Sequence, residues 1–303
     1  YVFPDTETTE PDAALFSADD LTINGSGSLV VNASYADGIT SKDDLRIVGG
    51  TITVDAADDA ITGKDLLGIK SGTFTLQAGS DGLRATNDTD AEKGFIYIEG
   101  GTFAITSGTD GLQAETTLGI TGGEFTMGTG GGSANSSSAA GQAGNTWGDW
   151  GGGQGPGAAG TTDGAGTVSV GTDSSSVSAK ALKAGAGVFV SGGEFNIDSS
   201  DDAIHSNGNV TIAGGSFAIS SGDDGIHADA SLQIDGGDIT ISQSYEGLEG
   251  AMITLDDGTV HVTASDDGVN VAGGADSSST SGRPGQNAFT VNENNQLHLN
   301  GGY

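Results

Sequence analysis

Residues 201–204 of the chain read DDAI, residues 223–226 read DDGI, residues 245–248 read YEGL and residues 266–269 read DDGV. The second residues of successive copies lie 22, 22 and 21 positions apart. A glycine turn lies between each pair of copies, at 214–215, 236–237 and 257–258. A unit of about 22 residues with two fixed marks is typical of one coil of a solenoid.

Earlier copies of the motif occupy the N-terminal half, at 37–39, 58–61 and 81–83, again 22 residues apart. An extra seven residues around Asn87–Lys93 delay the next copy to 110–112. The glycine turns at 49–50, 71–72, 100–101 and 122–123 show the same delay. Both marks therefore belong to one structural repeat.

Within a coil, apolar residues alternate in runs of three to five, as in Leu232-x-Ile234 and Ile239-x-Ile241. Alternation with a period of two indicates β-strands, and no run has the spacing of an amphipathic helix. Three short strands per coil, stacked in parallel, predict an all-β, right-handed parallel β-helix. Equivalent side chains, such as Phe195 and its copy 22 residues later, or Ile212 and its copy, should fill the core.

The whole chain, residues 1–303, is expected to form a single β-helix domain. Residues 1–20 form a lead-in or cap, residues 21–127 and 179–274 form coils, and residues 275–303 form a loop and the start of a further coil. Residues 128–178 form a side loop rich in Gly and Ser, which contains both tryptophans, Trp147 and Trp150.

The net charge is −32, from 41 acidic and 9 basic residues. Such a field repels nucleic acid and anionic membranes, so neither is an expected partner, and it attracts cations. The chain has no cysteine, which excludes disulfides and thiolate metal sites. No apolar run reaches the roughly 18 residues of a membrane span. Any signal or anchor segment is expected to precede Tyr1.

Stacking of the coils brings the acidic residues into columns, where carboxylates about 5 Å apart repel one another. Bound Ca²⁺, which takes oxygen ligands, is the simplest compensation, and Mg²⁺ fits less well. The alternative is a set of solvated turns, since Asp and Gly favour turns. The candidate calcium ligands are Asp37, Asp58, Asp59, Asp81, Asp110, Asp201, Asp202, Asp223, Asp224, Glu246, Asp266 and Asp267.

Two histidines, His205 and His227, occupy equivalent positions in successive coils. Together with Asp202 or Asp224 they offer a zinc site, against the alternative of two surface histidines.

The copies SSDDAIHSNGNVTIAGGSF (199–217) and SGDDGIHAD (221–229), the segment Ser178–Ala184 and the Trp-bearing side loop carry a family resemblance. The chain resembles bacterial, clostridial-type carbohydrate-binding proteins whose parallel β-helix is similar to that of polysaccharide lyases. The resemblance implies a right-handed β-helix, bound calcium at the acidic motif, and an extracellular or cell-surface location. It also implies binding of cellulose-like or acidic polysaccharides such as polygalacturonate.

Candidate sugar contacts are Trp147 and Trp150, which can offer aromatic faces to sugar rings, and Lys180 and Lys183, which can pair with uronate carboxylates. The tryptophans can equally pin the loop onto the solenoid. The lysines can equally neutralise the acidic column, because Lys180 stands where other coils have an acid.

Two other functions stay open. A calcium-dependent polysaccharide lyase would need a base beside the acidic motif, for which Lys180, Lys183 and Arg84 are the available residues, but no catalytic residue is assigned. A surface filament or adhesin would form if the open ends of the β-helix stacked head to tail, near Leu21 and Leu297.

Overall fold

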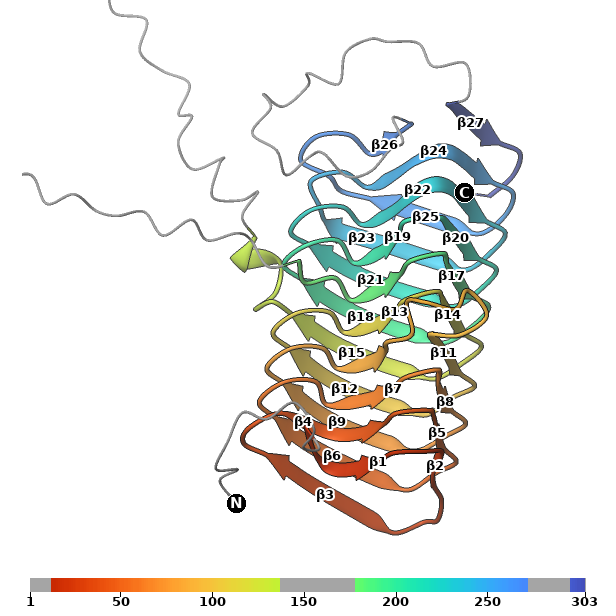
Figure 1. Cartoon of the computed structure of the whole chain (residues 1–303). Helices are drawn as coiled ribbons and strands as arrows, with labels where there is room; N and C mark the ends of the chain where they lie inside the picture. The colour runs from red at the N-terminus through yellow and green to blue at the C-terminus, as the bar shows by residue number, and fades with distance from the viewer. Residues whose placement is uncertain (1–11, 137–177, 272–294, 303) are drawn as a thin grey trace, which may run out of the picture.

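The computed structural model describes residues 12–136, 178–271 and 295–302. These residues form a parallel β-helix of about ten turns, with successive turns about 22 residues apart (Figure 1). The one helical segment among them is the short 3-10 helix η1 (Ser133–Asn135). The predicted all-β fold and its period are confirmed. No helix in the described ranges is long and apolar enough to cross a membrane.

Each coil contributes one strand to each of three parallel ladders. Ladder 1 contains β1 (Ala13–Ser17), β4 (Asp37–Ser41), β7 (Ile61–Gly63), β10 (Leu83–Ala85), β13 (Leu112–Ala114), β16 (Leu182–Ala184), β19 (Ile204–Ser206), the first parts of β22 (Ile226–Ile234) and β24 (Leu248–Leu255), and β26 (Val269–Asn270).

Ladder 2 contains β2 (Leu21–Ile23), β5 (Asp44–Ile47), β8 (Leu66–Ile69), β11 (Phe95–Ile98), β14 (Thr117–Ile120), β17 (Gly187–Val190), β20 (Asn209–Ile212), the second parts of β22 and β24, and β27 (Gln296–Leu299). Ladder 3 contains β3 (Ser28–Ala33), β6 (Thr51–Ala56), β9 (Thr73–Ala78), β12 (Thr102–Ser107), β15 (Glu124–Thr129), β18 (Glu194–Ser199), β21 (Ser216–Ser221), β23 (Asp238–Gln243) and β25 (Thr259–Val262).

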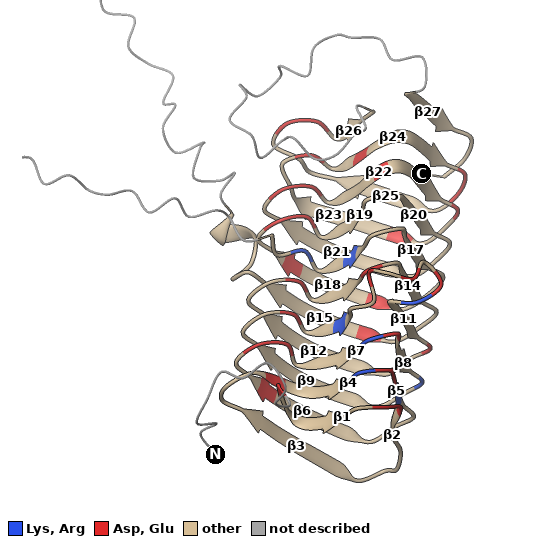
Figure 2. Ribbon diagram, viewed as in Figure 1, with Lys and Arg blue, Asp and Glu red and all other residues tan. Residues whose placement is uncertain are grey.

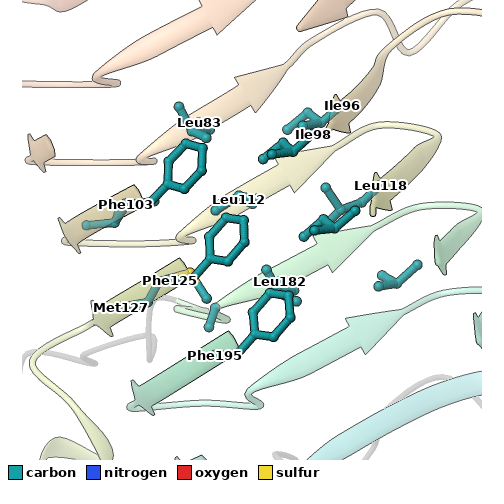
Figure 3. Close-up of a cluster of buried hydrophobic side chains, with 14 of the residues drawn as sticks. Leu83, Ile96, Ile98, Phe103, Leu112, Leu118, Phe125, Met127, Leu182 and Phe195 are labelled. Atoms are coloured by element: carbon teal, nitrogen blue, oxygen red, sulfur yellow. The ribbon is translucent and has the colours of Figure 1, made fainter. Parts of the chain in front are cut away.

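The core runs along the axis as stacks of identical or similar side chains. Five phenylalanines of ladder 3 stack ring on ring, with centroids 4.6–4.8 Å apart: Phe74, Phe103, Phe125, Phe195 and Phe217. Figure 3 shows three of these rings facing the leucines of ladder 1. The predicted pairing of Ile212 with Ile234 is also present. Parallel, in-register pairing makes each apolar side chain contact its own copies, which confirms the predicted core.

The glycine turns are fixed by backbone conformation. From β6 onward, the residue before each strand of ladder 3 is a glycine with a positive φ, for example +116° at Gly193 and +101° at Gly237. L-residues rarely adopt this conformation, which explains why the glycine recurs in register.

The structure shifts two of the predicted boundaries. Strand β1 lies inside the expected lead-in and pairs with β4, so the first coil begins at Ala13. Strand β15 extends to Thr129, past the expected start of the side loop. Strand β27 adds to ladder 2 beside β24, as expected for the start of a further coil.

Candidate functional site

The acidic residues of the motif stack at the corner that leads into ladder 1, seen as repeated red turns in Figure 2. We call them the acidic column: Asp37, Asp59, Asp81, Asp110, Asp202, Asp224, Glu246 and Asp267, with Lys180 in the interrupted coil. At five steps a carboxylate oxygen accepts the backbone N–H of the next coil's equivalent residue. These bonds join Asp37 to Asp59 (3.2 Å), Asp59 to Asp81 (2.9 Å), Asp81 to Asp110 (2.9 Å), Asp110 to Lys180 (2.8 Å) and Asp202 to Asp224 (2.9 Å).

These bonds confirm the predicted stacking and give the column a structural role. A carboxylate that accepts a backbone N–H makes a charge-assisted hydrogen bond. Each such aspartate therefore links two coils without a metal ion. The doubled acids lie on the outer side of the same corner, where Asp58 and Asp266 are exposed, Asp201 is half-buried and Asp223 is buried.

A second column, which the sequence analysis missed, runs beside the first on the ladder 1 strands. Its members follow each column residue by three positions, and this fixed spacing is the signal that could have revealed it. We call it the flanking column. It consists of Thr40, Thr62, Arg84, Gln113, Lys183, His205, His227, Glu249 and Asn270, in continuous parallel register.

Basic side chains of the flanking column neutralise acids of the first coils. Arg84 Nη1 lies 3.0 Å from Oδ2 of Asp59, and its Nε lies 3.5 Å from Oδ2 of Asp81. Lys183 Nζ lies 2.7 Å from Oδ2 of Asp110. The predicted sugar contact Lys183 therefore lies beside the acidic column, where its charge is compensated.

Lys180, the interruption of the acidic column, is itself buried. Its Nζ lies 2.8 Å from Oδ2 of both Asp201 and Asp202. Burial alone would lower the pKa of Lys180, but the charges of Asp202 and Asp201 outweigh it and raise the pKa above its usual value. Asp202 also accepts a bond from the His205 ring at 2.9 Å. Lys180 thus acts as the counter-ion inside the column, and little of it is available to a ligand.

Burial perturbs two acids of the first coils. Burial, and then the charge of Asp59, raises the pKa of Asp37 to about 6. Burial, and then the charge of Asp110, raises the pKa of Asp81 to about 6. These carboxyls are costly to ionise, which is the condition under which a bound cation stabilises a site.

Among the described residues, three clusters consist of carboxylates alone and suit Ca²⁺, which takes about six to eight oxygens. They are Asp201/Asp202/Asp223, Glu246/Asp266/Asp267 and Asp19/Asp20/Asp43. Lys180 already supplies positive charge to the first. The second lies at the C-terminal end, where Asn270 donates to Glu246 at 2.7 Å. The third was not predicted, although its doubled Asp19-Asp20 resembles the acidic motif.

A groove of about 470 Å³ lies on the outer face of ladder 1 over the first coils. It is lined by carboxylates of the acidic column, threonines of the flanking column and three cations, Lys42, Lys64 and Arg84. Lys42 Nζ lies 3.4 Å from Asp12 Oδ1, whereas Lys64 is exposed and makes no ion pair with a described residue. The groove offers donors and acceptors side by side.

The side loop leaves the solenoid at the corner of the acidic column. Ser133 N–H donates to Asp198 Oδ1 at 2.7 Å, and the Ser136 hydroxyl donates to the Gly222 carbonyl at 2.8 Å. The stem therefore crosses toward the acids at 223–224. The predicted sugar contacts Trp147 and Trp150 lie outside the described residues.

Comparisons with known proteins give the family. Over 56 residues the chain is 48% identical to a carbohydrate-binding domain-containing protein of Acetivibrio thermocellus, a stretch covering 18% of this chain and 20% of that relative. No solved structure matches the chain. The family model of the carbohydrate-binding domain-containing proteins matches residues 3–225. This match covers well over half of the chain, which therefore belongs to the family of carbohydrate-binding domain-containing proteins.

Proposed function

We propose that this chain is an extracellular, calcium-binding protein that binds a plant-type or acidic polysaccharide along the outer face of ladder 1. The observation that carries the proposal is the groove over the first coils, which cations and carboxylates line together. Membership of the family supports carbohydrate binding. A β-helix repeats its surface at about 4.8 Å per coil, which suits an extended, repeating ligand.

Within the groove, Lys64 is the proposed partner of a uronate carboxylate, because it has no described acidic partner of its own. Lys183, farther along the same face, is a weaker second contact, since Asp110 already binds it at 2.7 Å. Threonine hydroxyls and carboxylate oxygens beside them can exchange hydrogen bonds with sugar hydroxyls.

Calcium is proposed at the clusters that contain only carboxylates and have no lysine, Glu246/Asp266/Asp267 and Asp19/Asp20/Asp43. A bound Ca²⁺ would reduce repulsion in a chain of net charge −32. At the surface, the ion can also bridge the protein to carboxylates of an acidic polysaccharide, which reconciles an acidic protein with an acidic ligand.

The test is calorimetric titration of the full chain with polygalacturonate and with soluble cellulose oligosaccharides, in calcium and after chelation. Lys64→Ala should weaken polygalacturonate binding about tenfold, which corresponds to about 1.4 kcal/mol. Lys70→Ala, another exposed lysine outside the groove, is the matched control and should bind like the parent.

If Lys64→Ala and Lys183→Ala both bind polygalacturonate like the parent, the groove is not the sugar-binding site. If the Trp147→Ala/Trp150→Ala double variant alone abolishes binding, the sugar site lies on the side loop instead. The same titration after chelation tests the role of calcium independently of sugar binding. If chelation changes neither the melting temperature nor the affinity for polysaccharide, calcium has no role in the site.

A further inference from the structure

Two neighbouring coils carry nearly the same motif, but its buried polar side chains have hydrogen-bond partners in only one of them. In the first, DDAIHSN at 201–207, Asp202 Oδ2 bonds to Lys180 Nζ at 2.8 Å and to His205 Nδ1 at 2.9 Å. The other ring nitrogen of His205 bonds to Asn207 Oδ1 at 3.0 Å. The aspartate and histidine side chains of this copy therefore have hydrogen-bond partners within the protein.

The second copy, DDGIHAD at 223–229, lacks such partners. Both side-chain oxygens of Asp224 and both ring nitrogens of His227 are buried without a hydrogen-bond partner, as is Oδ1 of Asp229. The side chains of His227 and Asp224 are 0% and 1% exposed. Buried polar groups in native proteins nearly always have a partner. The orphaned atoms therefore point to a ligand.

Two of the orphaned atoms, His227 Nδ1 and Asp224 Oδ2, lie together beside a carboxylate oxygen of Glu249. His227 Nδ1 lies 3.2 Å from Oδ2 of Asp224 and 3.6 Å from Oε2 of Glu249. Ligand atoms about 2.0–2.1 Å from a tetrahedral Zn²⁺ lie about 3.3 Å from one another, which matches both separations. These three residues supply one ligand atom each within 4.8 Å of the others.

The opposite nitrogen of His227 supports the same assignment. Nε2 lies 3.3 Å from Oδ1 of Asp229. A histidine that binds a metal through one nitrogen usually donates the other N–H to a carboxylate, which fixes the tautomer. With the proton on Nε2, the lone pair of Nδ1 is available to a metal ion beside Asp224 and Glu249.

Two carboxyls of the cluster also lie close together, with one ligand atom of each within 4.8 Å of the other. Glu249 and Asp224 lie close enough to interact directly, and burial, followed by the neighbouring Asp224, raises the pKa of Glu249 to about 9. Burial and the charge of Asp202 raise the pKa of Asp224 as well. Like-charged buried groups of this kind bind either a shared proton or a cation.

We infer that Asp224, His227 and Glu249 form a buried site for a divalent ion of the zinc class, with Asp229 orienting the histidine. The imidazole nitrogen separates this site from a calcium site, because Ca²⁺ takes oxygen ligands. Three protein ligands leave a fourth position for water or another donor. The inference does not depend on the proposed sugar-binding function.

The test is titration of the chelator-stripped full chain with Zn²⁺ in an excess of Ca²⁺, which saturates sites made of oxygen alone. The wild type is expected to bind one Zn²⁺ per chain, and Co²⁺ in its place should give the intense visible absorption of a tetrahedral nitrogen-containing site. His227→Gln should abolish both signals. His205→Gln, in the satisfied copy one coil earlier, is the matched control and should keep them.

A second pair of variants guards against misfolding of the buried His227→Gln protein. Asp229→Asn keeps all three ligands and should lower the affinity for Zn²⁺ about 10–100-fold. Glu249→Gln, at a partly exposed position, should lose the site, while the melting temperature in chelator stays at or above the parent value because one of two repelling carboxylates is removed.

No stoichiometric Zn²⁺ binding by the folded wild type would overturn the inference. Binding that survives His227→Gln and Glu249→Gln would also overturn it, because the ion would then lie elsewhere on the acidic surface.

Discussion

Lys180 occupies the single position of the acidic column where a base replaces an acid, and its side chain is only 7% exposed. It contacts Asp201 and Asp202 at 2.8 Å, and Asp202 is fully buried. The lysine was a candidate sugar contact, but its surroundings show a buried counter-ion. Lys180 therefore compensates the charge of two carboxylates of the next coil.

Lys180→Met is therefore expected to destabilise the protein by roughly 3–5 kcal/mol, because it leaves Asp202 buried without its partner. The measurement is the free energy of unfolding from urea titration. Lys70→Met, at an exposed position, should change stability by less than about 0.5 kcal/mol. Equal effects of the two variants would show that the buried ion pair contributes no stability.

A second prediction at this scale concerns the glycine turns. Gly193 has φ +116°, and a Cβ there would lie 3.0 Å from Phe195 Cε2 and 3.1 Å from the Gly123 carbonyl oxygen. Gly193→Ala should cost about 1–3 kcal/mol through backbone strain and contact.

Gly128, in strand β15, is the control for Gly193, because an added Cβ meets nothing within 4 Å. Gly128→Ala should leave the melting temperature unchanged or raise it slightly, since Gly weakens a strand. A loss of stability as large as that of Gly193→Ala would argue against φ as the cause.

At the scale of the element, ladder 3 is held together by its stack of phenylalanines. Phe125 lies at the centre of the stack, 4.6 Å from the Phe103 ring and 4.8 Å from the Phe195 ring. Each coil contacts only its neighbours, so a cavity at one rung affects both adjoining interfaces.

Phe125→Ala should lower the free energy of unfolding by about 3–5 kcal/mol, the usual cost of a cavity left by a buried aromatic. The matched control is Phe189→Ala on strand β17, because that ring is 46% exposed. Chemical denaturation of both variants checks the prediction, which fails if the exposed site costs as much as the buried one.

At the scale of the whole molecule, buried acids that also repel one another contribute to the pH dependence of the metal-free protein. The folded-state pKa values of Asp37 and Asp81, raised to about 6, exceed the unfolded value of about 3.9. The folded protein thus binds these protons more tightly than the unfolded chain, so the contribution of these two groups to stability falls as pH rises from about 4 to about 6 and is constant above.

The melting temperature in metal-free buffer should therefore be higher at pH 5 than at pH 7. The corresponding difference in the free energy of unfolding is about 1–3 kcal/mol. Asp81→Asn removes one of the two titrating groups and should reduce the difference. Calorimetry across this pH range checks both statements, and a melting temperature that rises steadily from pH 5 to pH 7 would contradict them.

The coil period and the three strands could be predicted from the sequence, because a solenoid places residue i beside residue i+22 and its core follows from local alternation. The stacking of Asp37 on Asp59, and of Phe195 on Phe217, followed from that register alone. The boundary at Ala13 did not, since β1 carries no copy of the acidic motif.

The partners of each carboxylate were decided only by the tertiary structure. Asp202 and Asp224 stand in nearly identical local sequences, yet Lys180 satisfies the first, while Glu249 brings a further carboxylate to the second. The flanking column and the groove likewise combine residues from successive coils. The repeat fixes which residues become neighbours, but the free energy of a buried charge depends on the distance, burial and sign of all its neighbours together.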